Sequence, residues 1–168
     1  KVIRQLKAAE EDEEIRAVVL KVNSPGGAVA PSQEIYEQVK RFQKPLVISI
    51  SSLGASGALY VSAGAKKVFA NAGSLVGSIG VIMEFANLKK LYEWTKIDRY
   101  TIKTGKFKDS GAEFREMRPD EREYFQGLVD DSLLQFKGAV REGRKMTQAE
   151  VDAIADGRVF TGQQAKTL

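Results

Sequence analysis

Ser56 lies in the segment GASGA, between an apolar run and a second, helix-like segment. A serine at a sharp corner between a strand and a helix is a common position for a catalytic nucleophile. The same position suits a serine that caps a helix N-terminus, because its hydroxyl can accept from free backbone N–H groups. The segment also departs from the usual G-x-S-x-G pattern, since it ends in alanine. Taken alone, this motif leaves the nucleophile and the helix cap both open.

A nucleophilic serine in this chain needs an unusual base, because the sequence contains no histidine and no cysteine. Lysine, a carboxylate or a chain terminus remain, and a Ser–Lys pair is a known variant of this chemistry. A lysine can accept a proton only when it is neutral, and burial favours the neutral amine. The segment YTIKTGKFKDSG offers Lys103, Lys106 and Lys108, and spacing alone does not choose among them.

Three further positions could support such chemistry. The glycines of NSPGG, residues 26 and 27, could aim backbone N–H groups at a carbonyl oxygen, although an ordinary turn explains the same residues. Gly57 would let a substrate approach Ser56 closely. Ser78, in VGSIGV, could hold a neutral lysine in line or could simply bond to its local backbone. None of these segments matches the phosphate-loop pattern or the dinucleotide fingerprint.

The elements that would position these residues follow from the apolar pattern of the chain. Short apolar runs alternate with helical patterns, which indicates an α/β fold with a mostly parallel sheet and helices on both faces. We expect strands over 16–22, 45–50, 66–70 and 99–103, and helices over 2–10, 31–42, 58–65, 86–95 and 120–144. Thr147 with Glu150 forms a capping-box pattern, and Thr161 can cap a further short helix.

The length and composition of the chain limit the number of domains and the kinds of partner and cofactor to be expected. The 168 residues suit a single domain, and the net charge of +4, spread along the chain, gives no basic stripe for nucleic acid. The lack of cysteine excludes disulfides and thiolate metal sites, and we expect neither a metal nor another cofactor. No apolar run is as long as a membrane span. The abrupt ends, KVIRQL and QQAKTL, suggest a piece of a longer chain.

The ordered set of motifs resembles the signal peptide peptidase A family of Ser–Lys peptidases. The resemblance runs from VVLKVNSPGG through KPLVISISSLGASGALYVSAGAKKVFANAGSLVGSIGV and IKTGKFKDSG to DGRVFTGQQA. It implies the Clp protease/crotonase fold over a single peptidase domain, residues 1–168, with a C-terminal helical arm. It also implies membrane-attached oligomers that degrade leftover signal peptides on the extracytoplasmic side, with the membrane segment outside this chain.

The resemblance also assigns roles to individual residues. Ser56 falls on the family's nucleophile and Lys108 on its general base, which resolves the choice among the three lysines. Ser78 falls on the serine that hydrogen-bonds that lysine. Gly27 and Gly57 fall where backbone N–H groups form the oxyanion hole.

Apolar side chains around the motifs suggest a pocket for small or apolar residues of a peptide, formed by Val29, Leu53, Leu59 and Ile82. Leu59 stands where many members of the family have a small or aromatic residue. Two other functions compete with the peptidase. One is an acyl-CoA enzyme of the crotonase type, which would act through carboxylates. The other is a non-catalytic, membrane-associated scaffold in which both serines are caps.

Overall fold

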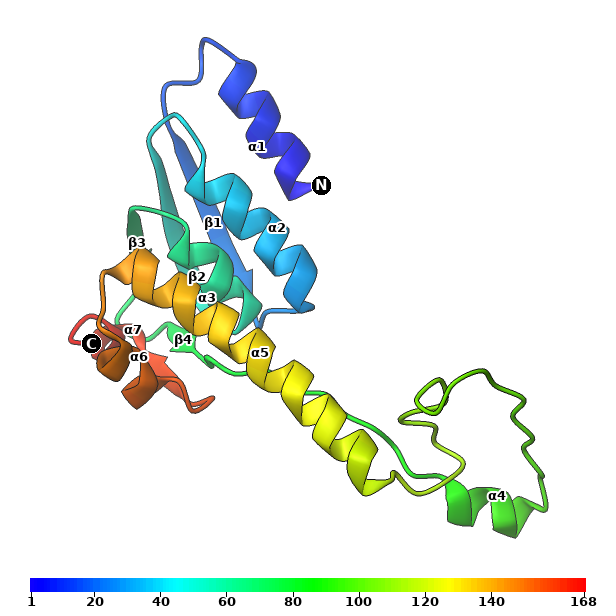
Figure 1. The fold of residues 1–168 in the computed structure, drawn as a ribbon. Helices are drawn as coiled ribbons and strands as arrows, with labels where there is room; N and C mark the ends of the chain where they lie inside the picture. The colour runs from blue at the N-terminus through cyan, green and yellow to red at the C-terminus, as the bar shows by residue number, and fades with distance from the viewer. The chain divides into compact units, whose positions relative to one another are not determined.

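The computed structural model describes residues 1–168, which form an α/β chain of seven helices and five strands (Figure 1). The helices are α1 (Val2–Glu11), α2 (Val29–Lys40), α3 (Gly57–Ala63), α4 (Lys89–Thr95), α5 (Pro119–Arg144), α6 (Gln148–Ile154) and α7 (Gly162–Ala165). The strands are β1 (Val18–Ser24), β2 (Leu46–Ala55), β3 (Lys67–Ala70), β4 (Leu75–Gly77) and β5 (Val159–Thr161).

The chain divides into two compact units. The sheet unit comprises residues 1–81 and 132–168, and the insert unit comprises residues 82–131. All five strands belong to the sheet unit, whereas α4 and the first half of α5 belong to the insert unit. Each unit is therefore described by itself.

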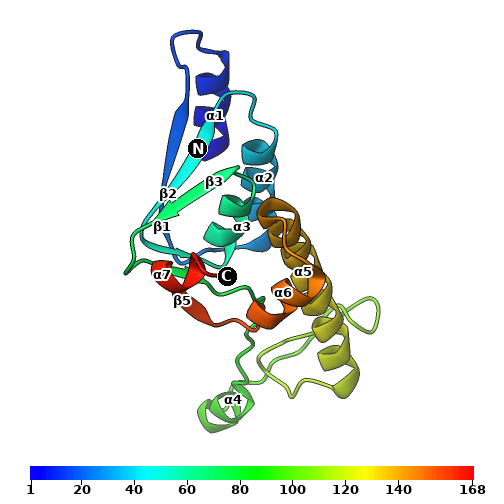
Figure 2. The same cartoon turned by 90° about the vertical axis from the view of Figure 1, so that its left-hand side faces the viewer.

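The sheet is organised around β2, its longest strand. β1 pairs with one edge of β2, while β3 and β4 follow each other along the opposite edge, and all three pairings are parallel. β5 adds to β4 in the antiparallel direction. The sheet with its neighbouring helices can be followed in Figure 2. The predicted mostly parallel α/β architecture is confirmed.

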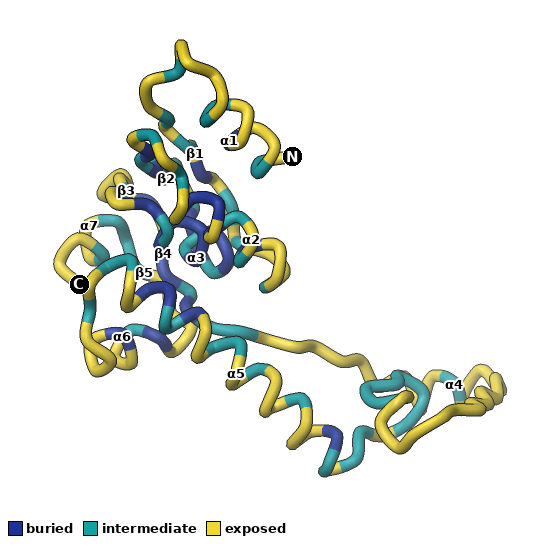
Figure 3. Tube along the Cα trace, turned by 45° about the horizontal axis from the view of Figure 1, so that its top comes forward, coloured by how far each residue is buried: buried dark blue, intermediate teal, exposed yellow.

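The core of the sheet unit follows from the alternation of side chains along β2. Leu46, Ile48 and Ile50 are buried on one face, in a cluster that includes Leu6 of α1 and Val39 of α2. Successive side chains of a strand point to opposite faces, so one row of residues supplies the core. Figure 3 shows buried backbone concentrated in the central strands and in α3.

The opposite face of the sheet is open along its outer strands. Val19 of β1 pairs with Val47 of β2, and Phe69 of β3 pairs with Ser49 of β2, so both side chains point to the face opposite Ile48. They are 67% and 56% exposed. The helices of this chain therefore cover mainly the face that carries Ile48.

Most predicted elements are present, with boundaries shifted by a few residues. The expected strand over 99–103 is wrong, because these residues form no regular structure and Tyr100 and Ile102 are 88% and 103% exposed. A strand needs a neighbour for its backbone hydrogen bonds, and none pairs with this segment. β4 and β5 are the two strands that the apolar pattern did not predict. Both predicted helix caps are confirmed, since Thr147 and Thr161 each form a complete capping box.

None of the helices combines the length and the apolar character that a bilayer crossing requires.

Helix α5 packs so closely on α3 that one of its glycines has no room for a side chain. A Cβ at Gly143 would lie 1.9 Å from the carbonyl oxygen of Ala63, whereas a Cβ at Gly138 meets nothing within 4 Å. We expect Gly143→Ala to lower the free energy of unfolding by about 1–3 kcal/mol through overpacking. Gly138→Ala, the matched control in the same helix, should raise it by up to about 1 kcal/mol. Urea denaturation of both variants checks this, and equal effects would contradict the close contact.

Candidate active site

Ser56 stands at the corner where β2 ends and α3 begins. Its backbone has φ 51° and ψ −125°, an unusual conformation for a residue other than glycine. Ser56 occupies the N-cap position of α3, but its hydroxyl makes no capping hydrogen bond. The helix-cap alternative is therefore not realised, and a partly buried hydroxyl remains free at a strained corner.

The turn after β1 presses its backbone against this corner. Gly26 has φ 106°, and a Cβ there would lie 2.6 Å from the nitrogen of Gly57 and 2.8 Å from Cβ of Ser56. Ser24 holds the turn, since its Oγ accepts from the N–H of Gly26 at 3.1 Å. Only a residue without a side chain allows this approach.

The same contact brings two backbone N–H groups close together. A Cβ at Gly57 would lie 3.1 Å from the nitrogen of Gly27 and 2.4 Å from Oγ of Ser32. Gly57 opens α3, and the N–H groups of a helix's first turn have no partner within the helix. Gly27 and Gly57 therefore place two donors beside Ser56, an arrangement able to stabilise negative charge on a carbonyl oxygen.

Ser78 lies on the segment that runs directly beside the same corner. The N–H of Ser56 donates to the carbonyl of Gly77 at 2.9 Å. Ser78 itself has φ 52°, and its N–H donates to the carbonyl of Arg158 at 2.7 Å. The structure thus brings Ser56, Ser78, Gly27 and Gly57 together within the sheet unit.

The turn that holds Ser78 was not identified as functional from the sequence. Gly157 has φ 87°, and its N–H donates to the carbonyl of Ile79 at 3.1 Å. Gly157 and Arg158 thus hydrogen-bond the backbone at two neighbouring points, the N–H of Ser78 and the carbonyl of Ile79. The signal in the sequence was the glycine of DGRVF, which marks a turn but not its neighbour in space.

The three candidate lysines lie in the insert unit and differ in their partners. Lys103 forms an ion pair and hydrogen bond with Asp109, and Lys106 Nζ lies 2.5 Å from Oδ2 of Asp120. Lys108 is exposed and forms no ion pair. The amines of Lys103 and Lys106 thus form ion pairs with carboxylates, whereas the amine of Lys108 does not.

A buried carboxylate organises the charges around this loop. The side chain of Glu121 is fully buried, accepts hydrogen bonds from the guanidinium of Arg115 and forms an ion pair with Arg118. The hydrogen bond from Arg115 is the main reason that the pKa of Glu121 falls to about 2. Arg115 and Lys103 likewise hold the pKa of Asp109 well below its usual range. Because both pKa values are depressed, the stabilisation is complete above about pH 4.5 and is lost as acid protonates the carboxylates.

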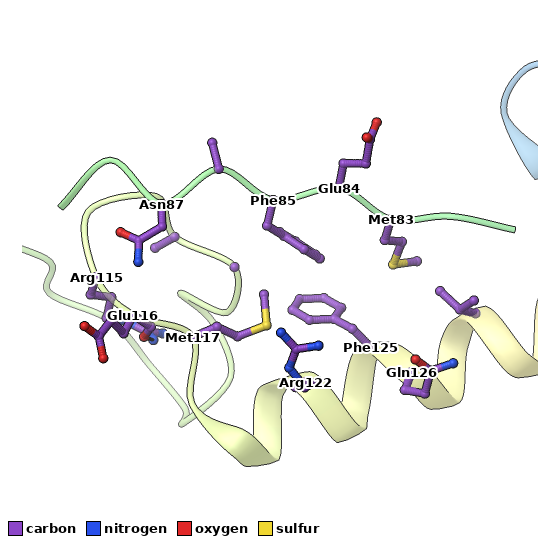
Figure 4. A pocket seen from close by; sticks show the side chains of 14 residues that line it. Met83, Glu84, Phe85, Asn87, Arg115, Glu116, Met117, Arg122, Phe125 and Gln126 are labelled. Atoms are coloured by element: carbon purple, nitrogen blue, oxygen red, sulfur yellow. Dashed lines mark hydrogen bonds between the residues drawn. The ribbon is translucent and has the colours of Figure 1, made fainter. Parts of the chain in front are cut away.

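A sizeable cavity lies in each unit. That of the insert unit has a volume of about 700 Å³ and is shown in Figure 4. The rings of Phe85 and Phe125 face each other there with centroids 4.5 Å apart, and Arg122 lies beside them. The cavity of the sheet unit, of about 690 Å³, is mostly apolar and is lined by Leu59, Ile79 and Phe160 among others.

The predicted pocket residues do not form one cluster. Val29 and Leu53 are partly buried in the sheet unit, and Leu59 lines that unit's cavity. Ile82 begins the insert unit and is 80% exposed. Their role in substrate binding stays a prediction. No group of three or more His, Cys, Asp or Glu side chains is arranged to hold a metal ion.

The sequence of residues 38–168 matches the model of peptidase family S49. The chain belongs to this family. The S49 peptidases have the Clp protease/crotonase fold, and the mostly parallel sheet described above is consistent with it.

Several curated proteins are similar over nearly the whole chain. A Synechocystis protein named "Putative protease slr0021" is 40% identical over 99% of this chain and 61% of its own length. "Putative signal peptide peptidase SppA" of Enterococcus faecium is 35% identical over 97% of the chain and 48% of its own length. "Serine protease SPPA, chloroplastic" of Arabidopsis thaliana is 31% identical over 97% and 24%. The S49 chain thus spans about half the length of the curated relatives it matches.

Gly26 and Gly27, in the turn after β1, provide a matched pair of substitutions. We expect Gly26→Ala to slow modification of Ser56 by a fluorophosphonate at least tenfold, because its side chain would force the turn away from Ser56 and misplacements of about 1 Å are costly. Gly27→Ala keeps the backbone N–H, and its Cβ meets nothing within 4 Å. It should retain the fold and most of the reactivity. Labelling rates and thermal unfolding of both variants check this, and a fully reactive Gly26→Ala protein would contradict the geometry.

Proposed function

We propose that this S49 chain is the catalytic part of a serine endopeptidase that works through a Ser–Lys dyad. One observation carries the proposal: the hydroxyl of Ser56 makes no capping hydrogen bond, and the turn that contains Gly26 and Gly27 packs against Ser56 and Gly57. Membership of a peptidase family points to peptide substrates.

The mechanism is acyl transfer. Oγ of Ser56 attacks the carbonyl carbon of the scissile peptide while neutral Lys108 accepts the hydroxyl proton. The N–H groups of Gly27 and Gly57 stabilise the oxyanion of the tetrahedral intermediate. The C–N bond then breaks as Lys108 passes its proton to the leaving amine. Water attacks the acyl-enzyme by the same route, and the acid product leaves while Ser56 regains its proton.

The partners of the three lysines support Lys108 as the base. A lysine paired with a carboxylate is favoured in its charged form, which cannot accept a proton. Lys103 and Lys106 are paired in this way, with Asp109 and Asp120. Lys108 has no such carboxylate partner. In the proposed site, the hydroxyl of Ser78 would hydrogen-bond the amine of Lys108 and orient it toward Ser56.

We propose that the substrates are small or apolar peptides, such as the remnants of cleaved signal peptides. Leu59, which lines the mostly apolar cavity of the sheet unit, supports this preference, and two relatives carry signal peptide peptidase or SPPA names. Following the family resemblance, we also propose that the complete protein is attached to a membrane through a segment outside this chain. Its catalytic part would then lie on the extracytoplasmic side.

A homo-oligomer completes the proposal. Lys108 is exposed, and burial against another surface would favour its neutral amine. The insert unit also exposes large apolar side chains, with Trp94 79% exposed and Ile102 entirely so. In α5, Leu134 is 64% exposed whereas Phe136 is buried. A second copy that covers such surface would supply the missing desolvation.

Labelling with a fluorophosphonate probe tests the function. The proposed peptidase forms a covalent adduct at Ser56, and Ser56→Ala loses both the adduct and peptide cleavage. A crotonase-type acyl-CoA enzyme or a scaffold would give no adduct at this serine. A screen of peptide libraries tests the substrate class, and a preference for charged residues beside the scissile bond would contradict it.

Substitution of each lysine by methionine tests the base. We expect Lys108→Met to abolish turnover while keeping the fold, because methionine has a similar length but accepts no proton. Lys103→Met and Lys106→Met should retain much of the activity. Wild-type activity should fall as the pH is lowered, since a protonated amine cannot act as a base. Near wild-type cleavage by Lys108→Met, or a dead Lys106→Met protein, would show that the assignment is wrong.

Dilution tests the oligomer. We expect the specific activity to drop as the protein is diluted below its assembly concentration, because dissociation removes the second copy that would cover the exposed apolar surface. Sedimentation at the same concentrations should show dissociation over the same range. A fully active monomer would overturn this part of the proposal.

A further inference from the structure

We propose that Arg115 is a positioning residue for Lys108: anchored on the buried carboxylate of Glu121, it fixes Asp109 and so the backbone that carries the lysine. This inference rests on the proposed role of Lys108 as the base. It assigns a task in catalysis to an arginine that lies outside the reacting groups.

The anchor is the carboxylate of Glu121, which has no exposure to solvent. It accepts hydrogen bonds from Arg115 Nη1 at 2.9 Å and Nη2 at 2.5 Å and from the backbone N–H of Arg118 at 2.9 Å. It also forms an ion pair with Arg118 Nη1 at 2.8 Å. Charge-assisted, bidentate hydrogen bonds of this kind fix the orientation of the guanidinium as well as its distance from the carboxylate. The guanidinium of Arg115 is therefore held rigidly on the first turn of α5.

The same guanidinium holds the residue next to Lys108 at two points. Nε of Arg115 donates to Oδ2 of Asp109 at 3.1 Å, and Nη2 donates to the carbonyl of Asp109 at 2.9 Å. Lys103 donates to the other carboxylate oxygen of Asp109. Both the side chain and the backbone of Asp109 are thus fixed by charged groups.

The backbone before Lys108 is held in a similar way. The carbonyl of Lys106 accepts from Nη2 of Arg118 at 3.2 Å and from Nζ of Lys103 at 3.2 Å. Lys108 therefore lies between two restrained positions, 106 and 109, and its own side chain is left unpaired. Residues 100–112 contain no helix or strand, so regular secondary structure does not place this loop.

A stabilising role alone does not account for this arrangement. Buried ion networks add little net stability compared with apolar packing, because desolvation of the charges offsets their attraction. Precise placement of a base matters more, since an error of about 1 Å can cost about a hundredfold in rate. The network connects a buried point on a helix to an exposed, catalytic loop.

Kinetics of Arg115→Met and Arg115→Lys in the whole protein test the proposal. We expect Arg115→Met to lower kcat, and the rate of Ser56 labelling, by about tenfold to a hundredfold while KM changes less than about threefold. Arg115→Lys keeps one charged donor and should recover part of the loss. Arg99→Met is the matched control, because the Arg99 guanidinium contacts Tyr92, Glu113 and Phe114 in the same unit instead of Asp109 or Glu121. It should keep wild-type kcat.

The outcomes separate this inference from the proposed function. A folded Arg115→Met protein with wild-type kcat overturns the positioning role, while an inactive Lys108→Met protein would still support the dyad. Activity in Lys108→Met instead removes the dyad and this inference with it. If Arg115→Met fails to fold in thermal unfolding, Asp109→Asn decides, because it keeps the shape of the side chain but loses its charge. A normal kcat in that variant overturns the proposal.

Discussion

The candidate site depends on one close approach of backbone to backbone. The turn after β1 lies against the start of α3 at a distance that excludes any side chain at Gly26. This contact brings the nitrogen of Gly27 close to Gly57, the residue that follows Ser56. Parallel pairing of β1 with β2 makes the approach possible, because it places the carboxyl ends of both strands at the same edge of the sheet.

The insert unit is organised by charge where the sheet unit is organised by apolar packing. Its only fully buried charged side chain is Glu121, which two arginines neutralise, and α4 has no buried residue at all. A loop built on charged contacts retains defined geometry without a large core. It also leaves apolar side chains such as Trp94 uncovered in the isolated chain. Both features are consistent with a unit that functions against another surface.

Much of the fold was predictable because its signals are local. Apolar runs such as residues 45–50 identified the buried strands, and the capping boxes at Thr147 and Thr161 follow from residues three positions apart. The expected strand over 99–103 failed because β propensity does not provide a neighbouring strand. β4 and β5 were not predicted for the opposite reason. Three residues are too few to carry a clear apolar pattern, and pairing with β2 and with β4, respectively, makes these segments strands.

The sequence by itself determined the types of residue available for chemistry: serines between glycines, lysines in place of histidine, and an order of motifs that resembles one peptidase family. The tertiary structure decided what each of them can do. In the structure, the Ser56 hydroxyl makes no helix-capping hydrogen bond, and Arg158 and Gly157 hydrogen-bond the backbone of Ser78 and Ile79. Lys103 and Lys106 form ion pairs with carboxylates. Those outcomes depend on contacts between residues far apart in the chain. No local pattern encodes such contacts, because they arise only when the packed strands and helices bring distant segments together.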